Sequence, residues 1–461
     1  QPAAAAPSGA DEGVIHSASA AIGRCFGRED PGCALPWLVK LEARAKGSQA
    51  VAYARGFERF LAGDLAVAAE KLTAVAAAKV VPESLRDRAK LHAALATATH
   101  ERTAKMLRTP LMDGRFVLWV APGPDEVLIP LMESVLKRAV VALELSFGTL
   151  PTGPLNIHVY PRVEDLAAVS GLTAKQIRDS GTIALCKYNR LMITSPADLL
   201  FGYSWADTIV HELVHWVIIR RAGPGVPIWV HEGLARSFEA TWRGSDPVEL
   251  QPEELAALAD ARRRKRFIPF SKMSPTMAQL PTQEATQLAF AEVHHAVGWI
   301  LQKARKEGVS GPIDVRPLLA RFDAGDDEAA AILTLVGVPR KAALKQWKKD
   351  LLAGRSAVGV LPTVERETVK KSKRERLKFK RVSSADPFKG LGAQARRWIE
   401  LGDRLLAINR PLAAVIEYRK ALSSGAKREP IMMRRMARAL VQLRRFDEAE
   451  KVAAQALQGH P

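Results

Sequence analysis

The sequence lacks any apolar run of the ~18 residues that a membrane-spanning helix requires, so we expect no transmembrane segment. Its three cysteines allow at most one disulfide within the chain. Aromatic residues make up only 6% of the chain, whereas alanine and leucine are abundant, and this mixture favours helices. A first methionine is also missing, and low-complexity sequence follows Gln1. We therefore expect residues 1–13 to be a flexible leader, left by signal-peptide removal or trimmed to resemble such a product, and hence a secreted or periplasmic, cell-envelope protein.

The composition is that of a globular protein with a basic surface. Hydrophobic residues make up 48% and charged residues 25%, which are globular values, and the length of 461 residues predicts two to four domains. The net charge of +19 attracts polyanions, and an acidic cell-envelope polymer is one candidate partner. Because the charge is spread over many predicted helices, it also fits a basic surface without a specific partner, and we expect no specific nucleic acid.

The cysteines fall into two groups. Cys25 and Cys33 flank the short loop 26–32, and they either close a small disulfide in an oxidising compartment or are unrelated thiols. Cys186 lies in an apolar run, which predicts a buried thiol.

Both ends of the chain are predicted to be helical. Residues 14–111 contain a hairpin pattern at 49–76, with small residues at paired positions and a Gly63-Asp64 turn. Residues 392–461 hold two copies of a pattern in which Ala414 and Ala449 are 35 positions apart. Both regions resemble tetratricopeptide repeats, and the resemblance implies a protein or peptide partner at the C-terminal repeats. Helices that only brace the neighbouring domain are the alternative.

The central region alternates between strand and helix patterns. Strands are expected at 116–120 and 155–160, and a hairpin or long edge strand at 182–195. Helices are expected at 125–145, 163–169 and 285–306, and the last ends near Leu352. A basic linker then covers 354–391, as a solvated tether or as a contact for an acidic surface. These patterns predict an α+β fold, mainly helical, with a small mixed sheet.

A His-Glu-x-x-His pattern marks the candidate site. His211 and His215 are four positions apart, so on a helix both rings lie on one face and can share one zinc ion. Glu212 projects to the side, where it can reach a zinc-bound water. A capping box of Ser204 and Asp207 is predicted to start this helix, and Gly223-Pro224-Gly225 to end it.

A catalytic zinc ion needs a third protein ligand. A third histidine six positions after His215 is excluded, because Arg221 stands there. The following helix carries adjacent His231 and Glu232, and only one of the two can face the metal. We also expect the small Gly233 to let this helix pack closely on the first.

This arrangement resembles a known family. The HELVH helix followed by Pro-x-Trp-x-x-Glu-Gly-x-Ala at 227–235 is similar to the peptidase MA-like gluzincins, over residues 112–353. The resemblance implies a thermolysin-like zinc peptidase domain that hydrolyses peptide bonds of a protein or peptide substrate. It implies His211, His215 and Glu232 as ligands of Zn²⁺, and Glu212 as the general base.

The chain departs from that family at two positions. Phe290 stands where the family often has a tyrosine that stabilises the oxyanion, so Tyr188, Tyr203 and the catalytic candidates His294 and His295 are possible replacements.

The second departure is Arg236, which stands where thermolysin-like enzymes carry an acidic residue one turn after the glutamate ligand. Asp207 or Glu239 is expected to orient a ligand histidine instead.

These departures keep a second hypothesis open, namely a catalytically weak or inactive peptidase-like scaffold that binds partners through its repeats. A third hypothesis is polyanion binding through the linker. The basic cluster 262–266 fits either an acidic substrate or a solvated helix end.

Overall fold

A computed structural model describes residues 9–199, 202–305 except 275, 278, 279 and 281, 312–356, 359–360, 388, and 390–457 except 408, 409, 427, 428 and 444. The chain forms two compact units, Gln1–Glu365 and Arg366–Pro461. Most of the predicted leader and most of the predicted basic linker lie outside the described residues. Residues 9–13 of the predicted leader belong to the first helix. No helix in the described part of the chain combines the length and the apolar character that crossing a membrane demands.

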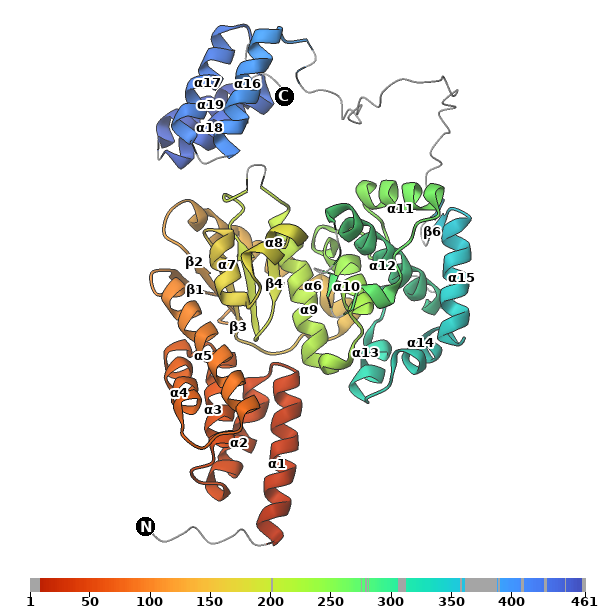
Figure 1. The fold of residues 1–461 in the computed structure, drawn as a ribbon. Coiled ribbons are helices and arrows are strands. Elements are labelled where there is room, and N and C mark those ends of the chain that lie inside the picture. The colour runs from red at the N-terminus through yellow and green to blue at the C-terminus, as the bar shows by residue number, and fades with distance from the viewer. Residues whose placement is uncertain are drawn as a thin grey trace. The chain divides into compact units, whose positions relative to one another are not determined.

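The first unit begins with a helical region, as expected. Its helices are α1 (Gly9–Gly27), α2 (Pro31–Arg44), α3 (Gln49–Ala62), α4 (Leu65–Ala77) and α5 (Glu83–Thr103), and Figure 1 shows them at one end of this unit. The predicted hairpin is α3–α4, whose turn uses Gly63 at φ 86°. The two helices approach closely because a Cβ on Gly56 would lie 2.9 Å from Cγ of Leu72. A disulfide joins Cys25 to Cys33, which decides between the two alternatives for this pair.

A five-stranded mixed sheet follows in the order β1-β2-β3-β5-β4. The central strands β2 (Phe116–Val120), β3 (Leu155–Tyr160) and β5 (Arg190–Thr194) are parallel, and antiparallel strands flank them on both sides. The flanking strand β1 (Leu107–Leu111) falls in a region that was predicted to be helical. Pro110 of this strand fits an edge position, because one side of an edge strand has no neighbouring strand and the missing N–H of proline is tolerated there.

The stretch 182–195 is a hairpin of β4 (Ala184–Cys186) and β5, one of the two forms predicted. Its turn residues Tyr188 and Asn189 have φ of 61° and 54°, the left-handed conformation that tight hairpin turns use. The short strand β4 is therefore at the edge of the sheet, and β5 lies inside it.

Helices cover the sheet and continue beyond it. The sheet lies on one side of α9 (Trp205–Ala222), and α10 (Ile228–Phe238) and the later helices of the first unit lie on the other (Figure 1). The long helix α12 (Gln283–Ala304) and the final helix α15 (Arg340–Leu352) agree with the expected ones. The remaining helices are α6 (Leu128–Phe147), α7 (Val163–Ser170), α8 (Ala174–Ser180), α11 (Pro252–Arg264), α13 (Arg316–Asp323) and α14 (Glu328–Val336), and β6 (Arg355–Ser356) pairs with β7 (Gly359–Val360).

Gly233 is a close-packing position, but its neighbour differs from the one predicted. A Cβ on Gly233 would lie 2.3 Å from Cγ2 of Val297 and 2.8 Å from the carbonyl oxygen of Val293. Both residues belong to α12, so the absence of a side chain at Gly233 lets α10 approach α12 closely. The sequence spacing identified the small residue but did not show which face of α10 it occupies.

The second unit contains α16 (Ala393–Ala407), α17 (Pro411–Ser423), α18 (Pro430–Gln442) and α19 (Phe446–Leu457). They form two helical hairpins, and Gly402 lets α16 contact Tyr418 of α17, since a Cβ there would lie 2.6 Å from the ring. The prediction of a mainly helical α+β fold with a small mixed sheet is thus confirmed.

Candidate metal centre

Helix α9 carries the two histidines of the pattern through the core. Ile209, Val210, Leu213 and Val214 are fully buried, so the apolar faces of the helix fix its position. Ser204 precedes the helix as predicted, but its hydroxyl donates to Oδ2 of Asp207 (2.9 Å) and does not cap a backbone N–H. The predicted capping box is therefore not formed, and the helix begins without a side-chain cap.

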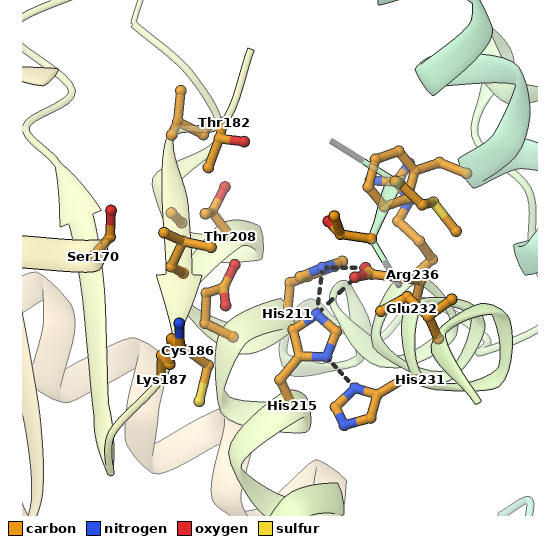
Figure 2. A pocket seen from close by; sticks show the side chains of 18 of the residues that line it. Ser170, Thr182, Cys186, Lys187, Thr208, His211, His215, His231, Glu232 and Arg236 are labelled. Atoms are coloured by element: carbon orange, nitrogen blue, oxygen red, sulfur yellow. Dashed lines mark hydrogen bonds and ion pairs between the residues drawn. The ribbon is translucent and has the colours of Figure 1, made fainter. Parts of the chain in front are cut away.

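His211, His215 and Glu232 converge on one point. Nε2 of His211 lies 3.1 Å from Nε2 of His215, and Oε2 of Glu232 lies 3.4 Å from each of these nitrogens. Figure 2 shows the two rings from α9 facing the carboxylate from α10. Zinc bonds of about 2.0–2.1 Å in tetrahedral geometry place ligand atoms about 3.3 Å apart. The separations and the nitrogen and oxygen donor set therefore fit one zinc ion.

The charges of this cluster favour a cation. Burial alone would lower the pKa of His211, but hydrogen bonds to Glu232 and Glu239 raise it to about 10. Burial alone would raise the pKa of Glu232, but His215 and His211 hold it well below its usual range. The carboxylate is therefore ionised, and the cluster stabilises positive charge beside it.

A second layer of side chains orients the two rings. Nδ1 of His211 lies 2.9 Å from Oε2 of Glu239, and Nδ1 of His215 lies 2.5 Å from Nδ1 of His231. Glu239 is thus the orienting carboxylate that the sequence offered beside Asp207. Asp207 instead accepts hydrogen bonds from Trp242 (2.7 Å) and Ser204. His231 contacts a ligand ring from behind, which leaves the position between the rings to Glu232.

Arg236 connects this layer to a buried carboxylate. Its Nη1 lies 2.8 Å from Oε1 of Glu239, and its Nη2 donates to Oε1 of Glu254 (2.8 Å). Glu254 in turn lies 3.0 Å from Nδ1 of His294. Arg236 therefore fixes the position of Glu239. Glu239, about one turn after Arg236, orients the ring of His211.

The cluster opens into a cavity of about 740 Å³. Glu212 lines it together with residues 181–187, which include strand β4, and Figure 2 shows Thr182, Cys186 and Lys187 across the cavity from the histidines. Burial raises the pKa of Glu212, and the backbone N–H of Cys186 hydrogen-bonds to its carboxylate. The predicted buried thiol of Cys186 is half-buried in this wall.

Other predicted site residues lie elsewhere. His294 contacts Glu254 and the carbonyl of Pro247 (3.2 Å), and His295 contacts the carbonyl of Arg355 (3.2 Å) and accepts from Trp347. Tyr203 donates to the carbonyl of Thr194, and Tyr188 packs on Phe60. None of these four predicted residues is among the described residues lining the cavity, whereas Phe290 is.

Glu29, from the loop between α1 and α2, is among the lining residues that sequence reasoning did not single out. No local pattern marks it, since its partners Tyr188 and Asn189 are about 160 positions further along the chain. The position of Glu29 between the two disulfide cysteines was the one available signal.

Comparisons of the chain with protein-family models, with curated proteins and with solved structures find no match.

Proposed function

We propose that the chain is a zinc-dependent metallopeptidase of the gluzincin type, with a thermolysin-like catalytic domain. The observation that carries the proposal is the convergence of His211, His215 and Glu232 in a cavity that Glu212 also lines. Two imidazoles and one carboxylate are a ligand set of catalytic zinc, which keeps a further position for water.

The residues of the site have separate roles in this proposal. When bound, Zn²⁺ polarises the scissile carbonyl and lowers the pKa of water towards ~7. Glu212 takes the proton from the attacking water and later delivers it to the leaving amine. Burial raises its pKa, which makes this carboxylate a stronger base than an exposed glutamate. Glu239 and His231 hold the ligand rings in place from behind.

The edge strand β4 supports a peptide as the substrate. Thr194 donates to the carbonyl of Ile183, and Lys187 donates to the carbonyl of Arg190, so alternate residues of β4 face β5. The backbone groups of Ala184 and Cys186 therefore point away from the sheet, along the cavity wall, where the N–H of Cys186 bonds to Glu212. An extended peptide pairing with this edge would pass the histidines and Glu212.

The location and partners of the protein follow as proposals. The Cys25–Cys33 disulfide supports an oxidising compartment, either outside the cell or in the periplasm or envelope. The two hairpins of the second unit are proposed to bind a protein partner as tetratricopeptide-like repeats. An acidic polymer is a proposed partner of the basic surface, where Arg263, Arg264 and Arg266 line a second hollow.

A second candidate function is a peptidase-like scaffold with weak or no hydrolysis. Phe290 favours it, because its ring lies 6.4 Å from that of His211, at the cavity wall, and cannot donate to an oxyanion. Partners would then bind through the helical hairpins.

Metal analysis and one substitution test these candidates. Protein prepared without chelators should contain one zinc per chain, and Glu212→Gln should retain it while losing cleavage of unfolded proteins. Glu249→Gln, at an exposed position, is the control. Zinc without Glu212-dependent cleavage would favour the scaffold, Glu212-dependent cleavage would exclude the scaffold, and absence of zinc would overturn the peptidase.

A further inference from the structure

A loop from the N-terminal helices reaches the metal cavity. The disulfide between Cys25 and Cys33 closes this loop, which contains Glu29 and Asp30. Glu29 has a left-handed backbone (φ 53°), a conformation that costs a non-glycine residue energy unless its surroundings hold it. The closed loop and the contacts of Glu29 together supply that support.

The Glu29 carboxylate holds the turn of the β4–β5 hairpin. Its Oε1 accepts from the backbone N–H of Tyr188 and its Oε2 from that of Asn189, both at 2.7 Å. Two successive N–H groups in a left-handed turn form a concave anion-binding site. Bonds of this charged kind are stronger than neutral ones, so the carboxylate fixes the end of strand β4.

The same loop also holds the metal-site helix. Arg220 of α9 lies 3.0 Å from the Asp30 carboxylate and donates to the carbonyl of Glu29 (3.3 Å). A second link runs directly from α9 to the turn, since Nε1 of Trp216 donates to Oδ1 of Asn189 (2.9 Å). The loop therefore bridges the two elements that form opposite walls of the cavity.

The turn is also packed firmly onto the N-terminal helices. The Tyr188 ring lies 5.0 Å from that of Phe60, and the buried Arg190 guanidinium donates to the carbonyl of Phe60 (2.8 Å). Phe26, within the disulfide loop, packs edge-on against Phe57 (5.0 Å). Helix α3, which carries Phe57 and Phe60, is thus the base on which the loop and the turn both rest.

We propose that the loop closed by Cys25 and Cys33 is a brace for the cavity, and that Glu29 is a positioning residue within it. The brace sets the edge strand β4 at a fixed distance from helix α9, so that Ala184 and Cys186 stay in the cavity wall and the Cys186 N–H stays bonded to Glu212. This inference rests on the proposed peptidase function, because it assigns the braced strand to substrate binding. The N-terminal helices then belong to the active unit, beyond any role in binding partners.

Substitution of Glu29 separates positioning from folding. In Glu29→Ala the hairpin turn loses both acceptors, so KM for a quenched fluorogenic peptide should rise about 10-fold while kcat changes less than about 3-fold. Glu29→Gln keeps one neutral acceptor and should fall between Glu29→Ala and the wild type. Zinc content should stay at one per chain in both. Glu249→Ala, at an exposed position away from the cavity lining, is the control and should match the wild type.

Removal of the disulfide tests the loop itself. The double variant Cys25→Ser/Cys33→Ser should raise KM in the same direction as Glu29→Ala, and adding it to Glu29→Ala should raise KM little further, because both act through one brace.

Amide hydrogen exchange gives a readout that does not require activity. Exchange at residues 184–190 should become faster in Glu29→Ala, while exchange in α9 around His211 stays within about 3-fold of the wild type. If the wild type cleaves no peptide, the peptidase function fails, and faster exchange in this strand alone would still support the brace. Unchanged exchange and KM in Glu29→Ala would overturn the brace, as would equal losses of zinc, kcat and thermal stability.

Discussion

The Oε2 atom of Glu239 lies 2.9 Å from Nδ1 of His211, while Nε2 of the same ring faces Glu232 at 3.4 Å. The ring is thus held between two carboxylates. The Glu239 carboxylate accepts a hydrogen bond from the Nδ1–H of His211, which leaves the Nε2 lone pair available to a metal ion. Arg236 fixes the other oxygen of Glu239 at 2.8 Å, so the orienting carboxylate is itself oriented.

This relationship predicts the effect of removing the Glu239 carboxylate. In Glu239→Ala the His211 ring loses its partner, and zinc affinity should fall about 10-fold to 100-fold, as measured by competition with a chelator. Glu239→Gln retains an acceptor oxygen, so its zinc affinity should fall less than that of Glu239→Ala. The exposed Glu249→Gln should bind zinc as the wild type does, and an unchanged affinity in Glu239→Ala would show that the ring needs no such support.

The neighbouring pair His231 and Glu232 allows a sharper test of ligand identity. His231 lies behind His215, with 2.5 Å between their Nδ1 atoms, whereas Glu232 faces both ligand nitrogens. Glu232→Ala should therefore abolish stoichiometric zinc binding, while His231→Ala should weaken it about 10-fold and His231→Asn less. Metal analysis after dialysis decides the matter, and the reverse ranking would make His231 the third ligand.

Local spacing predicted the part of the site that lies on two consecutive helices. The spacing of four positions from His211 to His215 places both rings on one face of the helix. The spacing of seventeen positions from His215 to Glu232 allows one short loop between the two helices. The same spacing could not choose between His231 and Glu232, because each face of α10 meets a different neighbour. The structure resolves this through packing: Gly233 faces α12, which turns Glu232 towards α9.

Local sequence patterns could not predict contacts between residues that are far apart in the chain. His294 and His295, on α12 like Phe290, were predicted as possible replacements for the oxyanion donor that Phe290 cannot supply. Their faces of the helix instead point to Glu254 and Trp347, whose positions depend on how α11 and α15 pack. The strand β1 was missed because its five residues have no strict alternation and contain a proline.

A buried carboxylate on α12 predicts a pH dependence of stability. Burial of Glu292 raises its pKa from 4.5 to about 8, although Ile268 donates to it and Lys348 is near. Between these pH values the folded state holds a proton that the unfolded state has lost, so this group makes the protein less stable as pH rises. Its contribution should fall by up to about 1.4 kcal/mol per pH unit in that window.

Denaturant unfolding of Glu292→Gln and the wild type at several pH values measures this contribution. The stability of the variant relative to the wild type should rise steadily from about pH 5 to pH 8 and level off above. Glu284→Gln is the control on the same helix, since hydrogen bonds at the helix start lower the pKa of that exposed residue and it stays ionised throughout the window. A difference independent of pH would mean that Glu292 is ionised in the folded protein.

The last prediction concerns the contact that places Glu232. An alanine at Gly233 would set its Cβ 2.3 Å from Cγ2 of Val297 and 2.8 Å from the carbonyl oxygen of Val293. Gly233→Ala should therefore push α10 away from α12 and lower stability by about 1–3 kcal/mol. It should also weaken zinc binding, because the proposed ligand Glu232 directly precedes Gly233 on α10. Val297→Ala should restore only part of the lost stability, since the clash with the Val293 backbone remains.

Gly298→Ala is the matched control on α12. A Cβ at Gly298 would lie 3.6 Å from its nearest neighbour, Val248, so the gain in helix propensity should leave stability unchanged or slightly higher. Thermal unfolding and chelator competition measure both effects. Equal behaviour of the two glycine variants would show that α10 is positioned by other contacts.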